Sequence, residues 1–285
     1  APAGTGGAKN VVVITPNSSA TAIGAFTYSS GLAWATVLEW IPNPAVVTDA
    51  TLRAAITATN LPWRVLDNGT NIEMLLVPGG TFMMGCSPGD AECIADESPT
   101  HQVTLTNAFY MGKTEVTQAQ WAAKMGNNPS YFVGYSDSPS RPVEQVSWNM
   151  IQGFNTATSL RLPTEAEFEY ACRAGNLTSR YGACEAIAWI GPMAGGQTHV
   201  IATKLPNALG FYDVIGNVQE WCQDWWGLFS SANVTNPTGP ASGSLRLLRS
   251  GGWLDPVTNC RASLRGNTTP ANSTKWIGFR AARNP

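Results

Sequence analysis

The chain has 285 residues, of which 44% are hydrophobic and only 13% are charged. This length allows one large domain, or one domain with a small annex, and the hydrophobic share is sufficient for a core. Low charge combined with high hydrophobicity excludes intrinsic disorder. The net charge of −2 provides no basic excess, so we expect neither nucleic acid nor an anionic membrane as a partner.

Residues 1–72 differ in texture from the rest of the chain. Two runs rich in β-branched or aromatic residues, 11–14 and 34–38, predict strands, and Thr48-Asp49 predicts the start of a short helix over 50–59. Although residues 10–38 lack charge, no apolar run of about 20 residues occurs, so no membrane span is predicted. We expect this segment to be a small β-rich annex with a docking or structural role.

From residue 72 onward, strands alternate with capped helices. The sequence predicts a strand–turn–strand around Pro78-Gly79-Gly80 and three helices that begin after Thr117, Ser147 and Thr164, the last with a capping box to Glu167. Further strands are expected at 103–105, 245–249 and 277–281. Long connections rich in Gly, Pro and Asn separate the last elements, which is typical of a fold with much irregular structure.

Six cysteines allow three disulfides. Spacing favours the pairs Cys86–Cys93, Cys172–Cys184 and Cys222–Cys260, which would indicate an oxidising compartment. The alternative is six buried free thiols, and spacing alone does not decide between fifteen connectivities. The sequence contains no C-x-x-C pair, so it predicts neither a zinc site nor a thioredoxin-type redox site.

Motifs for hydrolytic or phosphate chemistry are missing from the sequence. It contains no G-x-S-x-G, no H-E-x-x-H and no Gly-rich phosphate loop, and no pair of carboxylates stands out as an acid–base couple. Only two histidines occur, and His101 at the start of the 103–105 strand is interpreted as a satisfied surface or turn residue.

The segment 212–221 concentrates possible cation ligands. Asp213 and Glu220 offer carboxylates, with the carbonyls of Gly216 and Val218 between them, and such hard oxygen donors suit Ca²⁺. A turn whose carboxylates cap backbone amides explains the same spacing, and on spacing alone it is the better explanation. The tryptophans at 221, 225 and 226 are expected to pack in the core.

The C-terminal region alternates rigid motifs with small polar residues. Gly251-Gly252-Trp253, Asn259-Cys260-Arg261 and Gly278-Phe279-Arg280 flank the stretch 266–274, whose composition predicts an exposed loop. That loop is either a solvated connection or a binding surface held by the rigid motifs, and composition alone favours the connection.

Taken together, these motifs resemble the formylglycine-generating enzyme (sulfatase-modifying factor) family over about residues 72–283. The resemblance implies an α+β, C-type-lectin-like domain over residues 73–285, beside the annex of residues 1–72. The matching motifs are Pro78-Gly79-Gly80-Thr81-Phe82-Met83-Met84-Gly85, Glu115-Val116-Thr117-Gln118-Ala119-Gln120-Trp121, Pro142-Val143-Glu144-Gln145-Val146-Ser147-Trp148, Arg161-Leu162-Pro163-Thr164-Glu165-Ala166-Glu167-Phe168-Glu169-Tyr170, Gly216-Asn217-Val218-Gln219-Glu220-Trp221 and Gly278-Phe279-Arg280.

The resemblance also implies which activity to expect. Enzymes of the family bind copper with two cysteine thiolates five residues apart. Aligned on Trp253, the second falls on Cys260 and the first on Asp255. A carboxylate is a poor ligand for Cu(I), so the chain is predicted not to be an enzyme.

Of the family's two Ca²⁺ sites, one corresponds to Asp213, Gly216, Val218 and Glu220, which raises the expectation of Ca²⁺ there. The other lacks its expected asparagine near Pro192 and Met193.

The C-terminal motifs resemble, more specifically, the variable proteins of diversity-generating retroelements. In these, a reverse transcriptase randomises adenines, which excludes Lys, Glu, Gln, Met and Trp at diversified codons. Residues 249–280 would form the variable region, in which Trp253, Lys275 and Trp276 would be fixed. The residues that obey the codon limit and are predicted to contact a ligand are Leu254, Asp255, Pro256, Thr258, Asn259, Leu264, Gly266, Asn267, Thr268, Thr269, Ala271, Asn272 and Thr274.

These observations predict a non-catalytic protein that binds a macromolecular ligand, protein or glycan, through its C-terminal loops. We expect it outside the cell, on a cell surface or on a virion surface. Two other functions fit the sequence less well. One is a formylglycine-generating copper oxidase that acts on a sulfatase cysteine, and the other is a structural adhesion module with no specific ligand.

Overall fold

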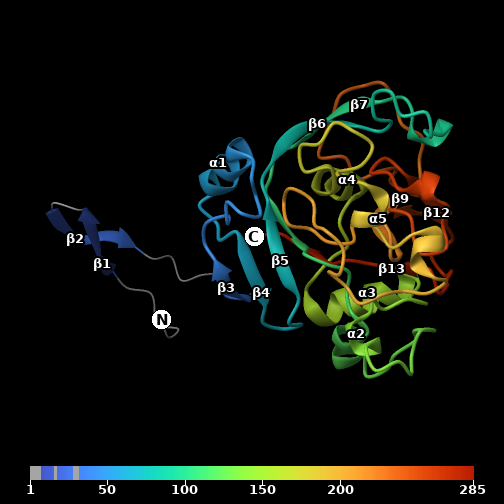
Figure 1. The fold of residues 1–285 in the computed structure, drawn as a ribbon, viewed down its shortest axis with the longest axis horizontal. Helices are drawn as coiled ribbons and strands as arrows, with labels where there is room; N and C mark the ends of the chain where they lie inside the picture. Colours follow the sequence, from blue (N-terminus) through green and yellow to red (C-terminus); the bar gives the residue numbers. More distant parts are fainter. Residues whose placement is uncertain (1–7, 16–17, 28–31) are drawn as a thin grey trace.

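The computed structural model describes residues 8–15, 18–27 and 32–285 (Figure 1). The first two ranges are an antiparallel pair, β1 (Ala8–Thr15) and β2 (Ser18–Thr27). The strand expected at 11–14 therefore lies within β1. The second expected strand is β3 (Ala35–Glu39), and the expected helix is α1 (Ala50–Ala58). Asp49 caps α1, because its side chain accepts a hydrogen bond of 2.7 Å from the Leu52 amide.

A five-stranded antiparallel sheet joins this first segment to the rest of the chain. Its order is β14-β8-β5-β4-β3, with β4 (Arg64–Asp67), β5 (Glu73–Val77), β8 (Phe109–Gly112) and β14 (Ala282–Arg283). In Figure 1, β5 lies between α1 and the later elements of the chain, and β3 and β4 lie on the same side of it as α1. Residue 72 lies between β4 and β5, which pair in the same sheet. The sheet therefore continues across the predicted domain boundary, and that boundary stays a prediction.

The two strands of the expected strand–turn–strand exist, but they belong to different sheets. β6 (Gly80–Met84) pairs with β7 (His101–Leu105), and β10 (Val234–Thr235) lies on the other side of β7. Crowding explains the glycines between β5 and β6. A Cβ on Gly79 would lie 2.8 Å from the Leu105 carbonyl oxygen, and one on Gly80 would lie 2.1 Å from the Tyr170 hydroxyl.

A four-stranded sheet carries the C-terminal region. Its order is β12-β11-β9-β13, with β9 (Gln219–Trp225), β11 (Arg246–Arg249), β12 (Arg265–Thr268) and β13 (Ile277–Gly278). β13 runs parallel to β9, and the other pairs are antiparallel. The strand expected at 277–281 ends at Gly278, because the chain then leaves this sheet for the five-stranded one. There the Val116 amide donates to the Phe279 carbonyl and the Gly112 amide to the Ala281 carbonyl.

All three predicted helix starts after residue 72 are confirmed. Capping boxes join Thr117 to Gln120 and Thr164 to Glu167, and the Ser147 side chain accepts from the Met150 amide. The helices they begin are α2 (Gln118–Met125), α3 (Trp148–Thr158) and α4 (Glu165–Arg173). The remaining helical turns are α5 (Cys184–Ile187) and the 3₁₀ turns η1 (Ala95–Glu97), η2 (Ser138–Ser140), η3 (Gly191–Ala194) and η4 (Val257–Asn259).

One large apolar core lies between the sheets and helices. The ring of Trp121 stacks on Phe154 with centroids 5.5 Å apart, and Phe279 meets both rings edge-on. Trp221 is fully buried and its indole donates to the Val146 carbonyl, as expected of a core tryptophan. Trp225 and Trp226, also expected in the core, are only half-buried. The architecture is α+β with long irregular connections, as predicted.

The disulfides differ from the predicted set. Cys86–Cys93 is confirmed, but the second bond joins Cys184 to Cys260, and Cys172 and Cys222 are buried free thiols. The predicted pairs Cys172–Cys184 and Cys222–Cys260 are therefore wrong. Cys172 lies on α4, where its thiol donates to the Val214 carbonyl and burial raises its pKa to about 12. Proximity in the sequence is a poor guide here, because α5 and η4 meet only in the folded chain.

In the part of the chain that the structure describes, no helix is long and apolar enough to span a bilayer.

Candidate functional site

Buried ion pairs fix both ends of the region 249–280. Arg249 is fully buried, with guanidinium nitrogens 3.0 Å from a Glu165 oxygen and 2.7 Å from a Glu169 oxygen. At the other end Arg280 donates to both oxygens of Glu220, at 2.7 and 2.6 Å. Removing one partner of such a pair leaves an uncompensated buried charge, which costs about 3–5 kcal/mol. The region therefore starts and ends at fixed points.

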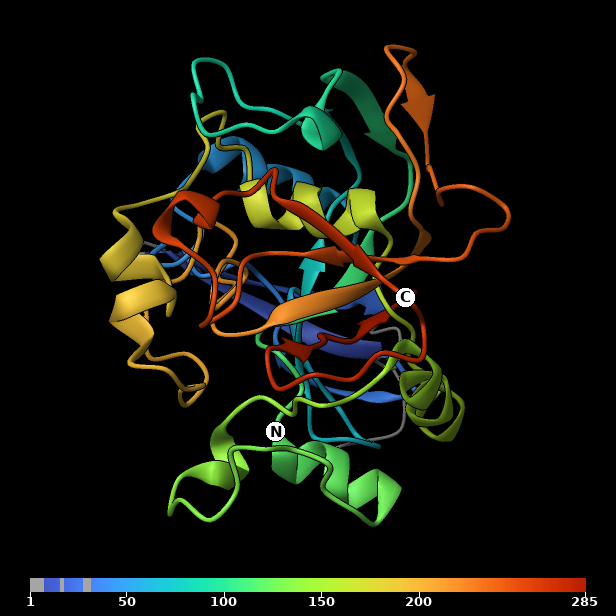
Figure 2. The ribbon, with the colours of Figure 1, turned by 90° about the vertical axis from the view of Figure 1, so that its right-hand side faces the viewer.

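Two more arginines pin the middle of the region. Arg261 pairs with Glu97, whose carboxylate also accepts from the Ser263 hydroxyl, and Arg265 lies 2.6 Å from Glu165. All of these side chains are buried. Two stretches are left between the fixed points: 250–260, which includes η4, and 266–276, which begins with the last residues of β12. We call them the C-terminal loops; they are drawn in red on the face turned toward the viewer in Figure 2.

The predicted contact residues fall mainly on these loops, and most reach the surface. The exposed ones are Leu254, Pro256, Thr258, Asn267, Thr269 and Ala271, and the half-buried ones are Asp255, Asn259, Gly266, Thr268, Asn272 and Thr274. Leu264 is the exception. It is only 6% exposed, since it lies between the buried Ser263 and Arg265, so a contact role for its side chain is not consistent with its position.

Asp255 organises the first loop. One of its oxygens accepts from the Gln219 side chain at 2.9 Å and from the Gly252 amide at 2.8 Å, and the other accepts from Asn259 at 3.0 Å. Cys260, at the end of the loop, is bonded to Cys184. The two positions that the resemblance assigns to copper thiolates therefore hold an engaged carboxylate and a disulfide sulfur, so these residues do not fit Cu(I).

The second loop is held by its own hydrogen bonds and by the segment before α3. The Asn272 side chain donates to Thr268, and the Asn272 amide donates to the Thr269 carbonyl, at 2.9 and 3.0 Å. The amides of Asn149 and Gln145 donate to the carbonyls of Pro270 and Thr274, each at 3.1 Å. The exposed side chains thus project from a backbone that is fixed at both edges.

Sequence reasoning missed a neighbouring segment, residues 130–135. The Phe132 ring meets the Trp253 ring edge-on at 5.4 Å, and the Lys275 ammonium lies 4.6 Å from the Tyr131 ring centroid and 5.5 Å from that of Trp253. The signal was in the sequence, because Tyr131-Phe132-Val133-Gly134-Tyr135 places large apolar residues inside an otherwise polar turn region.

Glu144 fixes the backbone of this segment. Its two oxygens accept from the amides of Tyr131 and Phe132, each at 2.9 Å. Burial raises the pKa of Glu144 to about 7, although these hydrogen bonds and the nearby Lys275 favour the charged form.

The predicted calcium ligands lie in a buried acidic cluster. Asp213 is fully buried; one of its oxygens accepts from the Ala202 amide at 2.7 Å, and the other has no partner. Burial raises its pKa to about 6. Both oxygens of Glu115, also buried, lack hydrogen-bond partners, and burial followed by repulsion from Asp213 and Glu220 raises its pKa well above the usual range.

These residues fit Ca²⁺ only in part. The free oxygen of Asp213 suits a cation, but both oxygens of Glu220 are already taken by Arg280. Among the described residues no three carboxylates, histidines or cysteines come close enough to hold a metal ion together. Ca²⁺ at Asp213, Gly216, Val218 and Glu220 stays a prediction.

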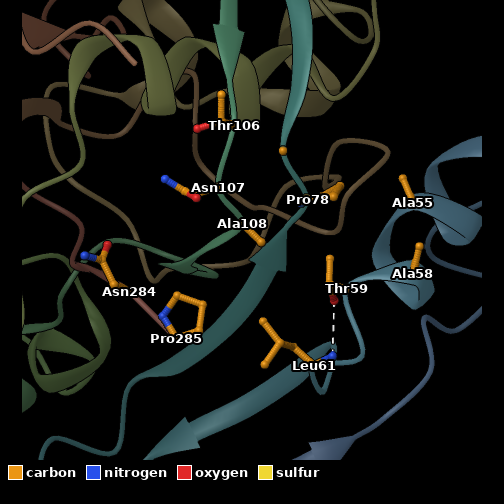
Figure 3. Close-up of a pocket in the computed structure, with 11 residues that line it drawn as sticks. Ala55, Ala58, Thr59, Leu61, Pro78, Thr106, Asn107, Ala108, Asn284 and Pro285 are labelled. Atoms are coloured by element: carbon orange, nitrogen blue, oxygen red, sulfur yellow. Dashed lines mark hydrogen bonds between the residues drawn. The ribbon is translucent and has the colours of Figure 1, made fainter. Parts of the chain in front are cut away.

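A pocket of about 640 Å³ lies on the other side of the sheet from the C-terminal loops, between α1 and the chain ends of β5 and β14 (Figure 3). It is lined by Ala55, Ala58, Thr59, Leu61, Pro78, Gly79, Thr106, Asn107, Ala108, Asn284 and Pro285. None of these side chains titrates near neutral pH, so the lining supplies no general acid or base of the usual kind. His101 lies elsewhere, buried against the Phe229 ring at 4.7 Å with one ring nitrogen 3.2 Å from the Pro99 carbonyl.

The chain matches a known protein family over most of its length. The family model of the sulfatase-modifying factor enzyme 1-like domain matches residues 64–285. The chain belongs to this family. The fold is C-type-lectin-like, as predicted.

A formylglycine-generating enzyme of Thermomonospora curvata is 34% identical over 74% of this chain and 93% of that protein. Treponema denticola variable protein 1 is a solved structure with a TM-score of 0.68 and 29% identity, over 75% of this chain and 95% of that one.

A third family relative is the serine/threonine-protein kinase pkn1 of Chlamydia pneumoniae, which is 32% identical over 74% of this chain. The match covers only 38% of that protein. This chain is thus similar both to proteins with enzyme names and to a variable protein, and family membership alone does not decide between catalysis and binding.

Proposed function

We propose that this protein is a non-catalytic ligand-binding protein whose C-terminal loops, 250–260 and 266–276, contact a macromolecule. The observation that carries the proposal is the state of Asp255 and Cys260, the two positions at which the resemblance predicts the family's copper thiolates. The Asp255 carboxylate accepts three hydrogen bonds, and Cys260 is bonded to Cys184. Neither offers a thiolate to a metal.

The construction of the region supports a binding role. The anchors Arg249, Arg261, Arg265 and Arg280 are buried and paired with carboxylates, whereas the loops between them expose small polar side chains. Exposed substitutions away from special features change stability by only about 0.5 kcal/mol. Such a scaffold tolerates changes in the contact residues while the fold is kept.

The similarity to a variable protein of Treponema denticola supports the finer proposal that residues 249–280 are diversified. Every residue proposed as a contact obeys the codon limit of adenine randomisation, and the fixed Trp253 and Trp276 lie against the core. Two disulfides in the fold favour an oxidising location, so we also propose an extracellular, cell-surface or virion-surface site.

The test of diversification is genomic. Sequencing around the gene should reveal a second near-copy of the stretch that encodes residues 249–280, differing at adenines, beside a reverse-transcriptase gene. If neither is present, the diversified role is wrong, and the protein is an ordinary lectin-like member of the family.

The alternative is an oxidase of the formylglycine-generating type, which the 34% identity to a named enzyme of that kind favours. It requires a reduced Cys260 that binds copper. If the binding proposal is right, wild type and Cys260→Ser should not differ in Cu(I) binding. Wild type should also form no aldehyde on a sulfatase-derived cysteine peptide. An aldehyde product would overturn the binding proposal.

A structural adhesion module remains the third possibility. It predicts that no exposed C-terminal residue matters for binding, so unchanged affinity of Asn267→Ala and Thr269→Ala for every ligand found would favour it.

A further inference from the structure

We propose that the ligand-binding face has a second half, formed by the exposed side chains of Tyr131, Val133 and Tyr135, and that it fits a protein surface poor in charge. We call these three residues the tyrosine edge. The inference rests on the proposed binding function and extends it to residues outside 249–280.

The tyrosine edge presents its large side chains outward at alternate positions. Tyr131 is 56% exposed, and Val133 and Tyr135 are each 48% exposed, whereas Phe132 between them is only 5% exposed. Exposed large apolar side chains that gather on one short segment of a folded domain mark an interaction site more often than isolated ones do.

The edge is continuous with the C-terminal loops. Phe132 packs on Trp253, whose indole donates to the Lys275 carbonyl at 3.0 Å, and the next residue, Leu254, is 56% exposed. Both halves lie on the side of the domain away from α1 and β3 (Figure 1), and they face the viewer together in Figure 2. A partner seated on Leu254 would therefore meet the tyrosine edge as well.

The edge is held in shape before any partner binds. Besides the two amides fixed by Glu144, the Phe132 carbonyl accepts from the side chains of Gln118 and Ser138, each at 3.1 Å. Tyrosine has few rotatable bonds and an amphipathic ring, so on a fixed backbone it contributes contact area at low entropic cost.

The charged groups of this face are engaged within the protein. The carboxylate of Asp137 is bound by Arg141 at 2.9 Å, that of Asp255 accepts three hydrogen bonds, and the Lys275 ammonium lies over aromatic rings. A charged group of a partner would find no free counter-charge here and would be costly to bury. The exposed valine, leucine and tyrosine side chains offer apolar area instead, in a setting of Ser, Asn and Gly that is typical of protein-binding loops.

The test uses a phage-displayed library of random peptides as the probe, selected on the full chain. The double variant Tyr131→Ser with Tyr135→Ser should weaken the enriched peptides by at least about 10-fold, the loss expected for anchor residues. Tyr131→Phe should change their affinity by less than about 2-fold, because the ring is kept. The matched control is Leu177→Ser, since Leu177 is exposed by 73% outside this face and should have no effect.

The affinity of peptides that bind through apolar area should also vary little between about 50 and about 500 mM salt. Enriched peptides that bind the double serine variant as well as wild type would overturn the inference, and circular dichroism checks that this variant is folded. If those peptides instead weaken with Asn267→Ala, the proposed function stands and only the tyrosine edge fails. If neither change matters, both fail. If arrayed glycans bind and no peptide is enriched, the protein partner is ruled out.

Discussion

Two buried charge clusters lie within the same domain, and their balance differs. Around Arg249, every oxygen of Glu165 and Glu169 has a hydrogen-bond partner, supplied by Arg249, Arg265, Arg173 or a backbone amide. Around Arg280, only Glu220 pairs with the guanidinium, and both oxygens of Glu115 and one of Asp213 have no hydrogen-bond partner.

The difference separates a structural anchor from a cluster under electrostatic stress. In the first, each buried charge is compensated, so the cluster fixes one end of the C-terminal region. In the second, burial and then the charges of Asp213 and Glu220 raise the pKa of Glu115, so protonation or a cation would relieve the repulsion. A substitution in the first cluster should therefore destabilise the protein, and one in the second should stabilise it.

The largest effect is expected from Arg249→Met, which removes the buried hydrogen bonds from Arg249 to Glu165, to Glu169 and to the carbonyls of Ala262 and Ser263. Hydrogen bonds to charged groups contribute about 1.5–3 kcal/mol each, so we expect a loss of about 3–5 kcal/mol in the free energy of unfolding, measured by urea denaturation. The control is Arg64→Met, because the Arg64–Glu39 pair is about one-third exposed and should cost no more than about 1 kcal/mol. Equal losses in the two variants would contradict the anchor role.

The disulfide that ends the first C-terminal loop is expected to contribute a similar amount. Cys184 and Cys260 are 76 residues apart, and Cys86 and Cys93 are 7 apart. Loop-closure entropy then predicts losses of about 4.5 kcal/mol for Cys260→Ser and about 2.4 kcal/mol for Cys93→Ser. Urea denaturation of both variants checks this order, and a larger loss for Cys93→Ser would show that chain entropy does not dominate.

Relieving the second cluster should stabilise the protein. The folded pKa of Glu115 lies above its unfolded value of about 4.5, so its favourable contribution is complete below that pH and is lost as pH rises through the folded pKa. Glu115→Gln cannot ionise, so at pH about 8 it should exceed wild type by about 1–3 kcal/mol. The gain should shrink at pH about 4.5. A variant that is less stable than wild type at both pH values would mean that the cluster is compensated after all.

The smallest effect concerns Ca²⁺. If a cation relieves the free oxygen of Asp213, a chelator should lower the melting temperature of wild type by about 1–2 °C and leave Asp213→Ala unchanged. The shift is expected to be small because Arg280 already occupies Glu220. An unchanged wild-type midpoint would remove the site.

Local signals in the sequence predicted much of the fold. The caps at Asp49, Thr117, Ser147 and Thr164 act over three or four residues, so the sequence alone locates them, and the family motifs supplied the arrangement. Contacts that join distant segments were not predictable in this way. The Cys184–Cys260 bond depends on where α5 and η4 meet.

The candidate face shows the same limit. The C-terminal loops could be named because their fixed motifs are recognisable, but the burial of Leu264 is a property of the folded chain that its composition does not show. The tyrosine edge joins the face only because Phe132 packs on Trp253, more than a hundred residues away in the sequence.

The last turn of the chain has a consequence for how variants of this protein would be screened in a cell. After the C-terminal loops, the backbone still has to supply β13 beside β9, Arg280 for Glu220, and β14 at the edge of the five-stranded sheet. A chain cut short inside residues 249–280 would lack these elements and would leave Glu220 buried and unpaired. We expect such a chain to be unstable and open to proteolysis, so only complete loops are compatible with the folded domain.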